Sequence, residues 1–148
     1  MNPMEYSEAG LAKTKEFEGL RLNAYQDSGG VWTIGYGHTG KDVKRGMTIT
    51  QEQADDLLKK DVQWAVDCVN KAVTQAVNQN QFDAMVDFTF NVGCGAFRGS
   101  TLLRKLNAGD SAGAAEEFLR WKFVKGVEVA GLLRRRQADR ALFLTPVQ

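Results

Sequence analysis

The sequence is poor in residues that interrupt, cross-link or anchor a chain. It has two prolines, two cysteines and one histidine among 148 residues. So few prolines, together with 43% hydrophobic residues, exclude a disordered chain and allow one globular domain with a core. A single histidine, with no Cys/His pair at metal-ligand spacing, gives no basis for a zinc site. We therefore expect no metal and no cofactor.

Two further absences concern membranes and secretion. No apolar run approaches the length needed to cross a bilayer. The first ten residues, MNPMEYSEAG, lack the basic and apolar segments of a signal peptide. Cys68 and Cys94 are too few for a disulfide framework. We expect a cytoplasmic product with free, buried thiols, no signal peptide or signal anchor, and no membrane insertion.

Charge is unevenly distributed along the chain. Residues 1–97 hold 9 Lys/Arg and 13 Asp/Glu, whereas residues 98–148 hold 10 Lys/Arg and 5 Asp/Glu. A basic C-terminal third favours an anionic partner such as nucleic acid, a membrane or a cell-wall polymer. A solvated helix face explains the same charges equally well. The arginine-rich segment lacks a base-reading motif, so we expect no nucleic-acid partner.

Hydrophobic periodicity and capping residues predict a mostly helical α+β fold. Ser7–Glu18 reads as a helix, with Ser7 as N-cap and Gly19 after its end. Leu20 to Arg45 is rich in glycine, β-branched and aromatic residues, which predicts a small antiparallel sheet. Apolar spacing and the Thr50/Gln53 capping-box pair predict one long helix over residues 50–73. Further helices are expected near Asn80–Val92, Ser100–Asn107, Ser111–Trp121 and Leu132–Leu144.

Several conspicuous side chains have ordinary structural explanations. His38 is expected to bond an acidic or backbone group. Trp32 and Tyr36 are expected to pack in the core, as is Trp64 on the apolar face of the long helix. The role of Trp121 stays open between the core and the junction of two lobes.

Glu18 occupies an unusual place for a carboxylate. Leu11 lies two helical turns earlier on nearly the same face, and Phe17 is adjacent, so Glu18 lies beside the stripe expected to be buried. It also ends a helix, where the macrodipole disfavours negative charge. Both effects favour the neutral acid, which is the form that a general acid needs. The alternative is a carboxylate that reaches solvent at a frayed helix end.

Asp27 and Thr33 flank the turn of the predicted hairpin. If the hairpin is symmetric about residue 30, they lie opposite each other, and Tyr25 shares their face. Singly, a turn aspartate and a strand threonine need no functional explanation. With Glu18 they offer a neutral acid, an ionised carboxylate and a hydroxyl, which are the groups that glycoside hydrolysis uses.

At these residues the sequence resembles the bacteriophage-type lysozymes, or endolysins. Their signature is a Glu, eight residues, an Asp or Cys, five residues and a Thr, and here it reads Glu18, Asp27 and Thr33. The similarity continues through MTITQEQADDLLKKD, NQNQFDAMVDFTFNVGCGAF, GSTLLRKLNAGD and GLLRRRQADRALFL. The resemblance implies one two-lobed lysozyme-like domain over residues 1–148. It would have a small β-containing lobe near 20–49, a connecting helix near 50–73, and a helical lobe near 74–148 that includes the N-terminal helix.

The resemblance also implies an activity and its residues. The enzyme would hydrolyse the β-1,4 bond between N-acetylmuramic acid and N-acetylglucosamine in peptidoglycan. Glu18 would be the general acid, Asp27 the base or nucleophile, and Thr33 would position water. The positions carried over as substrate-binding are Thr39, Phe90, Asn91, Ser100 and Arg135, with Arg134 or Arg136 as alternatives to Arg135. Inverting or retaining stereochemistry stays open.

The same resemblance implies a biological setting. A monomeric endolysin would wait in the host cytoplasm until a holin released it to the cell wall in the periplasm, where it would lyse the host. One rival interpretation is a lytic transglycosylase, which uses one acid and leaves an anhydro end. Another is a non-catalytic peptidoglycan-binding homologue. The presence of Glu18, Asp27 and Thr33 at the family spacing argues against both.

Overall fold

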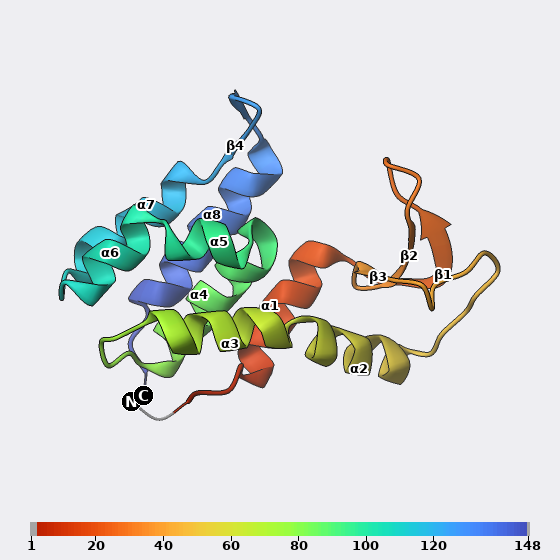
Figure 1. Ribbon diagram of the computed structural model, residues 1–148, viewed down its shortest axis with the longest axis horizontal. Coiled ribbons are helices and arrows are strands. Elements are labelled where there is room, and N and C mark those ends of the chain that lie inside the picture. The colour runs from red at the N-terminus through yellow and green to blue at the C-terminus, as the bar shows by residue number, and fades with distance from the viewer. Residues whose placement is uncertain (1–2, 148) are drawn as a thin grey trace. The chain divides into compact units, whose positions relative to one another are not determined.

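The computed structural model describes residues 3–147 as two compact units (Figure 1). The small unit comprises Leu11–Gln63. The large unit comprises the residues up to Gly10 together with those from Trp64 onward. Most residues are helical and the strands are short and antiparallel, which confirms the expected α+β class. Among residues 3–147, no helix is both long and apolar enough to cross a bilayer.

The elements follow one another along the chain as two clusters of strands among eight α-helices in the described residues. The helices are α1 (Glu8–Glu18), α2 (Gln51–Asp61), α3 (Gln63–Ala72), α4 (Gln79–Val92), α5 (Cys94–Arg98), α6 (Thr101–Asn107), α7 (Ser111–Glu117) and α8 (Ala130–Leu144), with a 3₁₀ turn, η1, at Phe118–Arg120. The strands are β1 (Arg21–Gln26), β2 (Trp32–Gly35), β3 (His38–Thr39), β4 (Phe123–Val124) and β5 (Val127–Glu128).

In the small unit, a three-stranded antiparallel sheet of order β1-β2-β3 lies beside α2 (Figure 1). Ile34 from β2 and Ala54 and Leu58 from α2 are almost completely buried, and they form the centre of this unit's core. Tyr36 is buried and Trp32 half-buried, in line with the packing expected for both. The core therefore packs the β1–β2 hairpin against α2, and this packing supports the turns of the hairpin.

The helix predicted over residues 50–73 is two helices in the structure. The Thr50 side chain accepts from Gln53 N and the Gln53 side chain accepts from Thr50 N, which confirms the capping box. However, α2 ends at Asp61 and α3 begins at Gln63. Val62 is buried, so apolar residues continue at helical spacing across the junction. The hydrophobic periodicity therefore gives no sign of the break.

In the large unit, α4 packs along α8 and supplies the most buried side chains (Figure 1). Phe88 of α4 meets Phe97, Phe118 and Trp121 edge-on, with ring centroids 5.4–6.3 Å apart. Such edge-to-face contacts add to the hydrophobic stabilisation from burial. Trp121, whose role the sequence left open, is thus a half-buried member of this aromatic cluster.

The structure corrects two expectations about side chains. Cys68 and Cys94 are joined in a disulfide, with Cα atoms 6.0 Å apart, so the prediction of free thiols is wrong. A separation of 26 residues along the chain does not indicate the spatial distance on which bonding depends. Trp64 is 45% exposed instead of buried. Trp64 lies in the first turn of α3, where the neighbouring Ala65 and Val66 take the buried positions.

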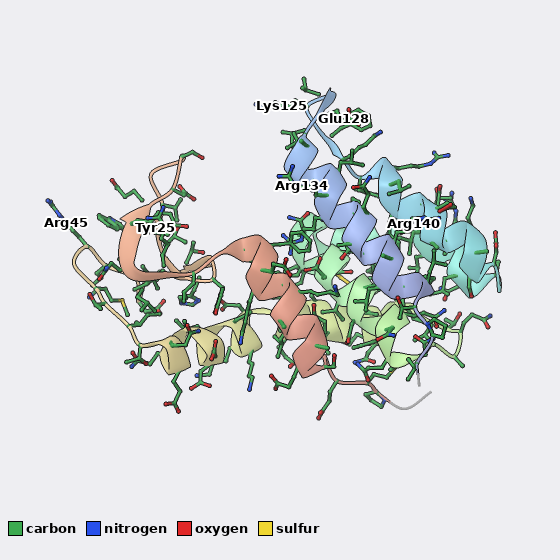
Figure 2. The ribbon with its side chains drawn as sticks, turned by 180° about the vertical axis from the view of Figure 1, so that it is seen from behind. Tyr25, Arg45, Lys125, Glu128, Arg134 and Arg140 are labelled. Atoms are coloured by element: carbon green, nitrogen blue, oxygen red, sulfur yellow. A yellow bond between two sulfur atoms is a disulfide. The ribbon has the colours of Figure 1, made fainter. Side chains whose placement is uncertain are left out.

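The segment expected as a helix over Ser111–Trp121 ends early. The α-helix stops at Glu117, and the 3₁₀ turn of η1 follows. A hairpin of β4 and β5, absent from the sequence prediction, then projects before α8 begins (Figure 2). Figure 2 labels Lys125 and Glu128 on this hairpin. Each strand has only two residues, which is too short for an alternating pattern to be recognised.

Candidate active site

Glu18 is the last residue of α1 and is half-buried. The helix ends because Gly19 takes a left-handed conformation (φ +73°), and its N–H donates to Lys15 O at 3.0 Å. The carboxyl group faces the turn between β2 and β3: a Cβ added at Gly37 would lie 3.4 Å from Glu18 Oε1. The end of α1 therefore presents this carboxyl group to the β2–β3 turn.

Asp27 organises the turn between β1 and β2. Its Oδ1 accepts hydrogen bonds from Gly29 N at 2.8 Å and Val31 N at 2.9 Å. The side chain is exposed, and no hydrogen bond from residues 3–147 reaches Oδ2. Two backbone donors and contact with water suit a negative charge. Asp27 therefore offers one carboxylate oxygen, held in a fixed direction, to a ligand or a water molecule.

Thr33 is tied to Asp27 through one carbonyl group. Val31 O accepts from Asp27 N at 2.9 Å and from Thr33 Oγ1 at 3.0 Å. Because the hydroxyl proton of Thr33 is donated to Val31, its oxygen lone pairs are left to accept a hydrogen bond. The structure thus brings two of the three expected catalytic residues to the same oxygen atom.

The register of this hairpin differs from the prediction. Thr33 lies opposite Tyr25, not opposite Asp27. The assumption of symmetry about residue 30 fails because the backbone and side chain of Asp27 both bond Val31, which closes the loop one residue earlier. Tyr25 therefore shares a face with Thr33, and Arg21 lies over the Tyr25 ring at 4.8 Å. Figure 2 labels Tyr25 on β1.

On the other side of β2, Thr33 pairs with Thr39 of β3. Thr39 is exposed, and its backbone lies one strand away from the threonine linked to Asp27. Of the five residues expected to bind substrate, it is the one that belongs to the small unit with Glu18, Asp27 and Thr33.

His38 has the structural role that the sequence suggested. Its Nδ1 lies 2.7 Å from Asp61 Oδ2 and its Nε2 lies 2.9 Å from Asp42 Oδ2. Burial lowers the pKa of His38, but the hydrogen bonds and negative charges of Asp42 and Asp61 outweigh it and raise the pKa above 6.5. The same contact lowers the pKa of Asp42. Within the described residues, no group of three or more His, Cys, Asp or Glu side chains has the arrangement of a metal site.

Arg135 belongs to a buried ion pair of the large unit. Its Nη2 and Nε donate to the two carboxylate oxygens of Asp87 at 2.8 and 3.1 Å. Arg136, the next residue, is fully buried and donates to Asn91 Oδ1, while Arg134 is exposed. Asp87 is not among the residues that the sequence predicted for the site. An acid inside the apolar stretch FDAMVDFTF is the signal that could have revealed it, since such a group requires a buried partner.

The remaining two expected binding residues have packing or capping contacts. The Phe90 ring lies 5.9 Å from that of Trp64. Ser100 is buried as the N-cap of α6: its Oγ donates to Phe97 O at 2.7 Å and accepts from Leu103 N at 3.1 Å. Ser100 also lines a pocket of about 320 Å³ together with Trp121.

Comparison with known proteins reveals similarity over nearly the whole chain. The family model described as phage lysozyme matches residues 15–139, a range that includes Glu18, Asp27, Thr33 and Arg135. The endolysin of Salmonella phage P22 is 48% identical over 146 residues, which cover 96% of this chain and 99% of that protein. The endolysin of Bacillus phage PZA is 51% identical over 142 residues, covering 95% of this chain and 55% of that protein. The chain thus spans about half the length of this second relative.

A solved structure supports the same relationship. The muramidase domain of SpmX from Asticaccaulis excentricus superposes with a TM-score of 0.89 at 43% identity. The match covers 96% of this chain and 99% of that domain.

Proposed function

The chain belongs to the phage lysozyme family, which places it among the glycoside hydrolases, and we propose that it hydrolyses the β-1,4 bond between N-acetylmuramic acid and N-acetylglucosamine in peptidoglycan. The link of Asp27 and Thr33 to one carbonyl oxygen is the observation that carries this proposal. It joins the backbone N–H of Asp27 and the hydroxyl group of Thr33 to the same atom, and in the proposed arrangement the Asp27 carboxylate and the Thr33 hydroxyl group both hydrogen-bond one water molecule.

In the proposed mechanism, Glu18 donates a proton to the leaving glycosidic oxygen. Asp27 Oδ2, which is not used by the turn, takes a proton from the water that attacks the anomeric carbon. Thr33 Oγ1 accepts the other hydrogen of this water, because its own proton is donated to Val31 O. Direct attack by Asp27 on the anomeric carbon is the alternative: as the leaving oxygen takes the proton of Glu18, a covalent glycosyl-enzyme would form. Water oriented by Thr33 would then hydrolyse this bond and give its proton to the ionised Glu18.

Mass spectrometry of purified peptidoglycan after digestion tests the reaction type. Hydrated disaccharide-peptides with a reducing muramic acid end are the expected products. Products with a 1,6-anhydro end would instead identify a lytic transglycosylase and remove Asp27 from the mechanism. A protein that binds peptidoglycan but releases no fragments would be a non-catalytic homologue.

We also propose that the protein lyses its host only after a separate permeabilising protein, a holin, gives it access to the wall. Bacteria that express the chain alone should keep their optical density, and it should fall rapidly when the cytoplasmic membrane is permeabilised. Lysis by the chain alone at the same expression level would exclude this route.

A further inference from the structure

A pocket of about 400 Å³ in the large unit is lined by residues of α3 and α5. Both of its walls are held by the disulfide, since Cys68 belongs to α3 and Cys94 to α5. The other side chains that define its character are Trp64, Asp67 and Lys71 from α3 and Arg98 from α5. None of these residues belongs to the catalytic set of Glu18, Asp27 and Thr33.

Trp64 gives this pocket an aromatic wall. Trp64 is 45% exposed, although the centroid of its ring lies 5.9 Å from that of the Phe90 ring. Trp64, Cys68 and Lys71 follow one another at helical spacing, so the tryptophan, disulfide and amine share one face of α3. An exposed aromatic side chain beside a concave surface is accessible to a ligand, and aromatic side chains are common in the lining of binding pockets.

Two basic side chains line the same pocket as Trp64. Lys71 and Arg98 are exposed, and neither forms an ion pair with a described residue. Asp67 is the one acidic side chain among the lining residues. Two cations against one acid favour a ligand with carboxylates, and the guanidinium of Arg98 has the fork geometry that binds them.

We propose that this pocket, whose lining shares no residue with the catalytic set, is an additional peptidoglycan-binding site. A sugar ring packs against Trp64, and carboxylates of the stem peptides pair with Lys71 and Arg98. The disulfide fixes the two walls before binding, which reduces the entropy lost when the complex forms. The inference depends on the proposed function for the identity of its ligand.

The test measures binding of the protein to purified peptidoglycan sacculi by cosedimentation. All variants carry Glu18→Gln, so that digestion does not remove the ligand. Adding Trp64→Ala should weaken binding at least about fivefold, the loss typical for truncation of an aromatic anchor. Trp64→Phe should retain most of the affinity, because it keeps an aromatic face. The double change Lys71→Ala with Arg98→Ala should also weaken binding, and more strongly at low salt than at high salt.

Two matched controls lie elsewhere on the chain. Phe123→Ala removes another exposed aromatic ring, and the double change Lys44→Ala with Arg45→Ala removes another exposed amine and guanidinium outside residues 98–148; both should bind sacculi like the parent. Thermal unfolding of each variant separates lost binding from lost folding. If Trp64→Ala unfolds, the Lys71 and Arg98 double variant decides alone, because these exposed side chains have no ion-pair partner in the described residues.

Unchanged binding in both the Trp64→Ala and the Lys71/Arg98 variants would overturn the proposal. Product analysis with the wild-type protein is independent of this result. If the wild type releases no fragments while its binding still depends on Trp64, the proposed catalytic function fails and the additional binding site stands.

Discussion

At the scale of single residues, the candidate site depends on Asp27 performing two tasks with different atoms. Oδ1 holds the turn through Gly29 N and Val31 N, and Oδ2 is left for chemistry. A carboxylate whose orientation is fixed by backbone donors loses little entropy when it binds a water molecule. In the proposed mechanism, one side chain therefore serves both turn formation and catalysis.

Asp27→Asn should separate these tasks. The amide oxygen still accepts from the turn, but the group no longer takes a proton from water, so the hydrolysis rate should fall by about 10²- to 10⁴-fold. Thermal unfolding should change little. Asp56→Asn, at an exposed position of α2, is the matched control and should hydrolyse peptidoglycan at the wild-type rate. A rate for Asp27→Asn within a few-fold of this control would contradict the assignment.

His38 supports a pH-dependent prediction. Because its pKa is raised in the folded protein, contact with Asp42 and Asp61 stabilises the fold fully below the ordinary value of 6.5. This contribution is lost as the pH rises through the raised value. The difference in unfolding free energy between wild type and His38→Gln should therefore shrink from about pH 5.5 to about pH 9. Denaturant titrations at both pH values check it, and a difference that grows with pH would show the opposite linkage.

At the scale of elements, caps determine where helices begin. Thr50→Ala removes the side-chain acceptor from the first turn of α2, and we expect a loss of about 1 kcal/mol in unfolding free energy. Ser111→Ala, at an exposed first position of α7, should stay within about 0.5 kcal/mol of wild type. Urea denaturation of the two variants compares them, and equal stabilities would show that the capping box contributes nothing.

The disulfide joins α3 to α5 across 26 residues. Cross-linking a loop of this size restricts the unfolded chain, so replacing Cys68 and Cys94 by serine should lower stability by about 3 kcal/mol. Calorimetry under oxidising conditions measures the loss. Wild type with a reducing agent should unfold close to the double variant, and identical melting with and without reductant would refute the cross-link's contribution.

A feature of the fold could be predicted from the sequence where the residues that determine it are close together along the chain. The capping box formed by Thr50 and Gln53 and the end of α1 at Gly19 each depend on residues close together in the sequence, and both were predicted. The break at Val62 was missed because the buried face continues through it. The hairpin register was wrong because a side-chain bond from Asp27 to Val31 reset the loop.

The candidate site shows the same division. Glu18, Asp27 and Thr33 could be selected because motif spacing and element ends are visible in the sequence. The partners that position other side chains could not, because they lie far away along the chain. Asp87 meets Arg135 across 48 residues, and Asp61 meets His38 across 23. Only the packed structure brings such residues into contact.

At the scale of the whole molecule, the net charge of +1 conceals an uneven distribution. The 10 Lys/Arg and 5 Asp/Glu of residues 98–148 all belong to the large unit. Several basic side chains from this stretch are ion-paired, as Arg140 is with Glu116, and others such as Arg134 are exposed (Figure 2). The exposed ones give this unit a basic surface that an anionic wall would attract.

Salt should therefore weaken binding to the wall. Raising ionic strength from about 0.05 M to about 0.5 M shortens the screening length to a few ångströms, so the affinity of the Glu18→Gln protein for sacculi should fall several-fold. Chitin, an uncharged polymer with the same type of linkage, provides the control, and binding to it should change little. Equal salt effects on both polymers would argue against an electrostatic contribution.

Replacement of Glu18 tests the central claim most directly. Glu18→Gln keeps the shape of the side chain but removes the acidic proton, while Glu16→Gln makes the same change at an exposed position two residues away on α1. The measurement is the rate at which each variant releases reducing ends from purified peptidoglycan. We expect Glu16→Gln to match the wild type and Glu18→Gln to be slower by at least about 10²-fold. Comparable rates for the two variants would contradict the assignment of Glu18 as the general acid.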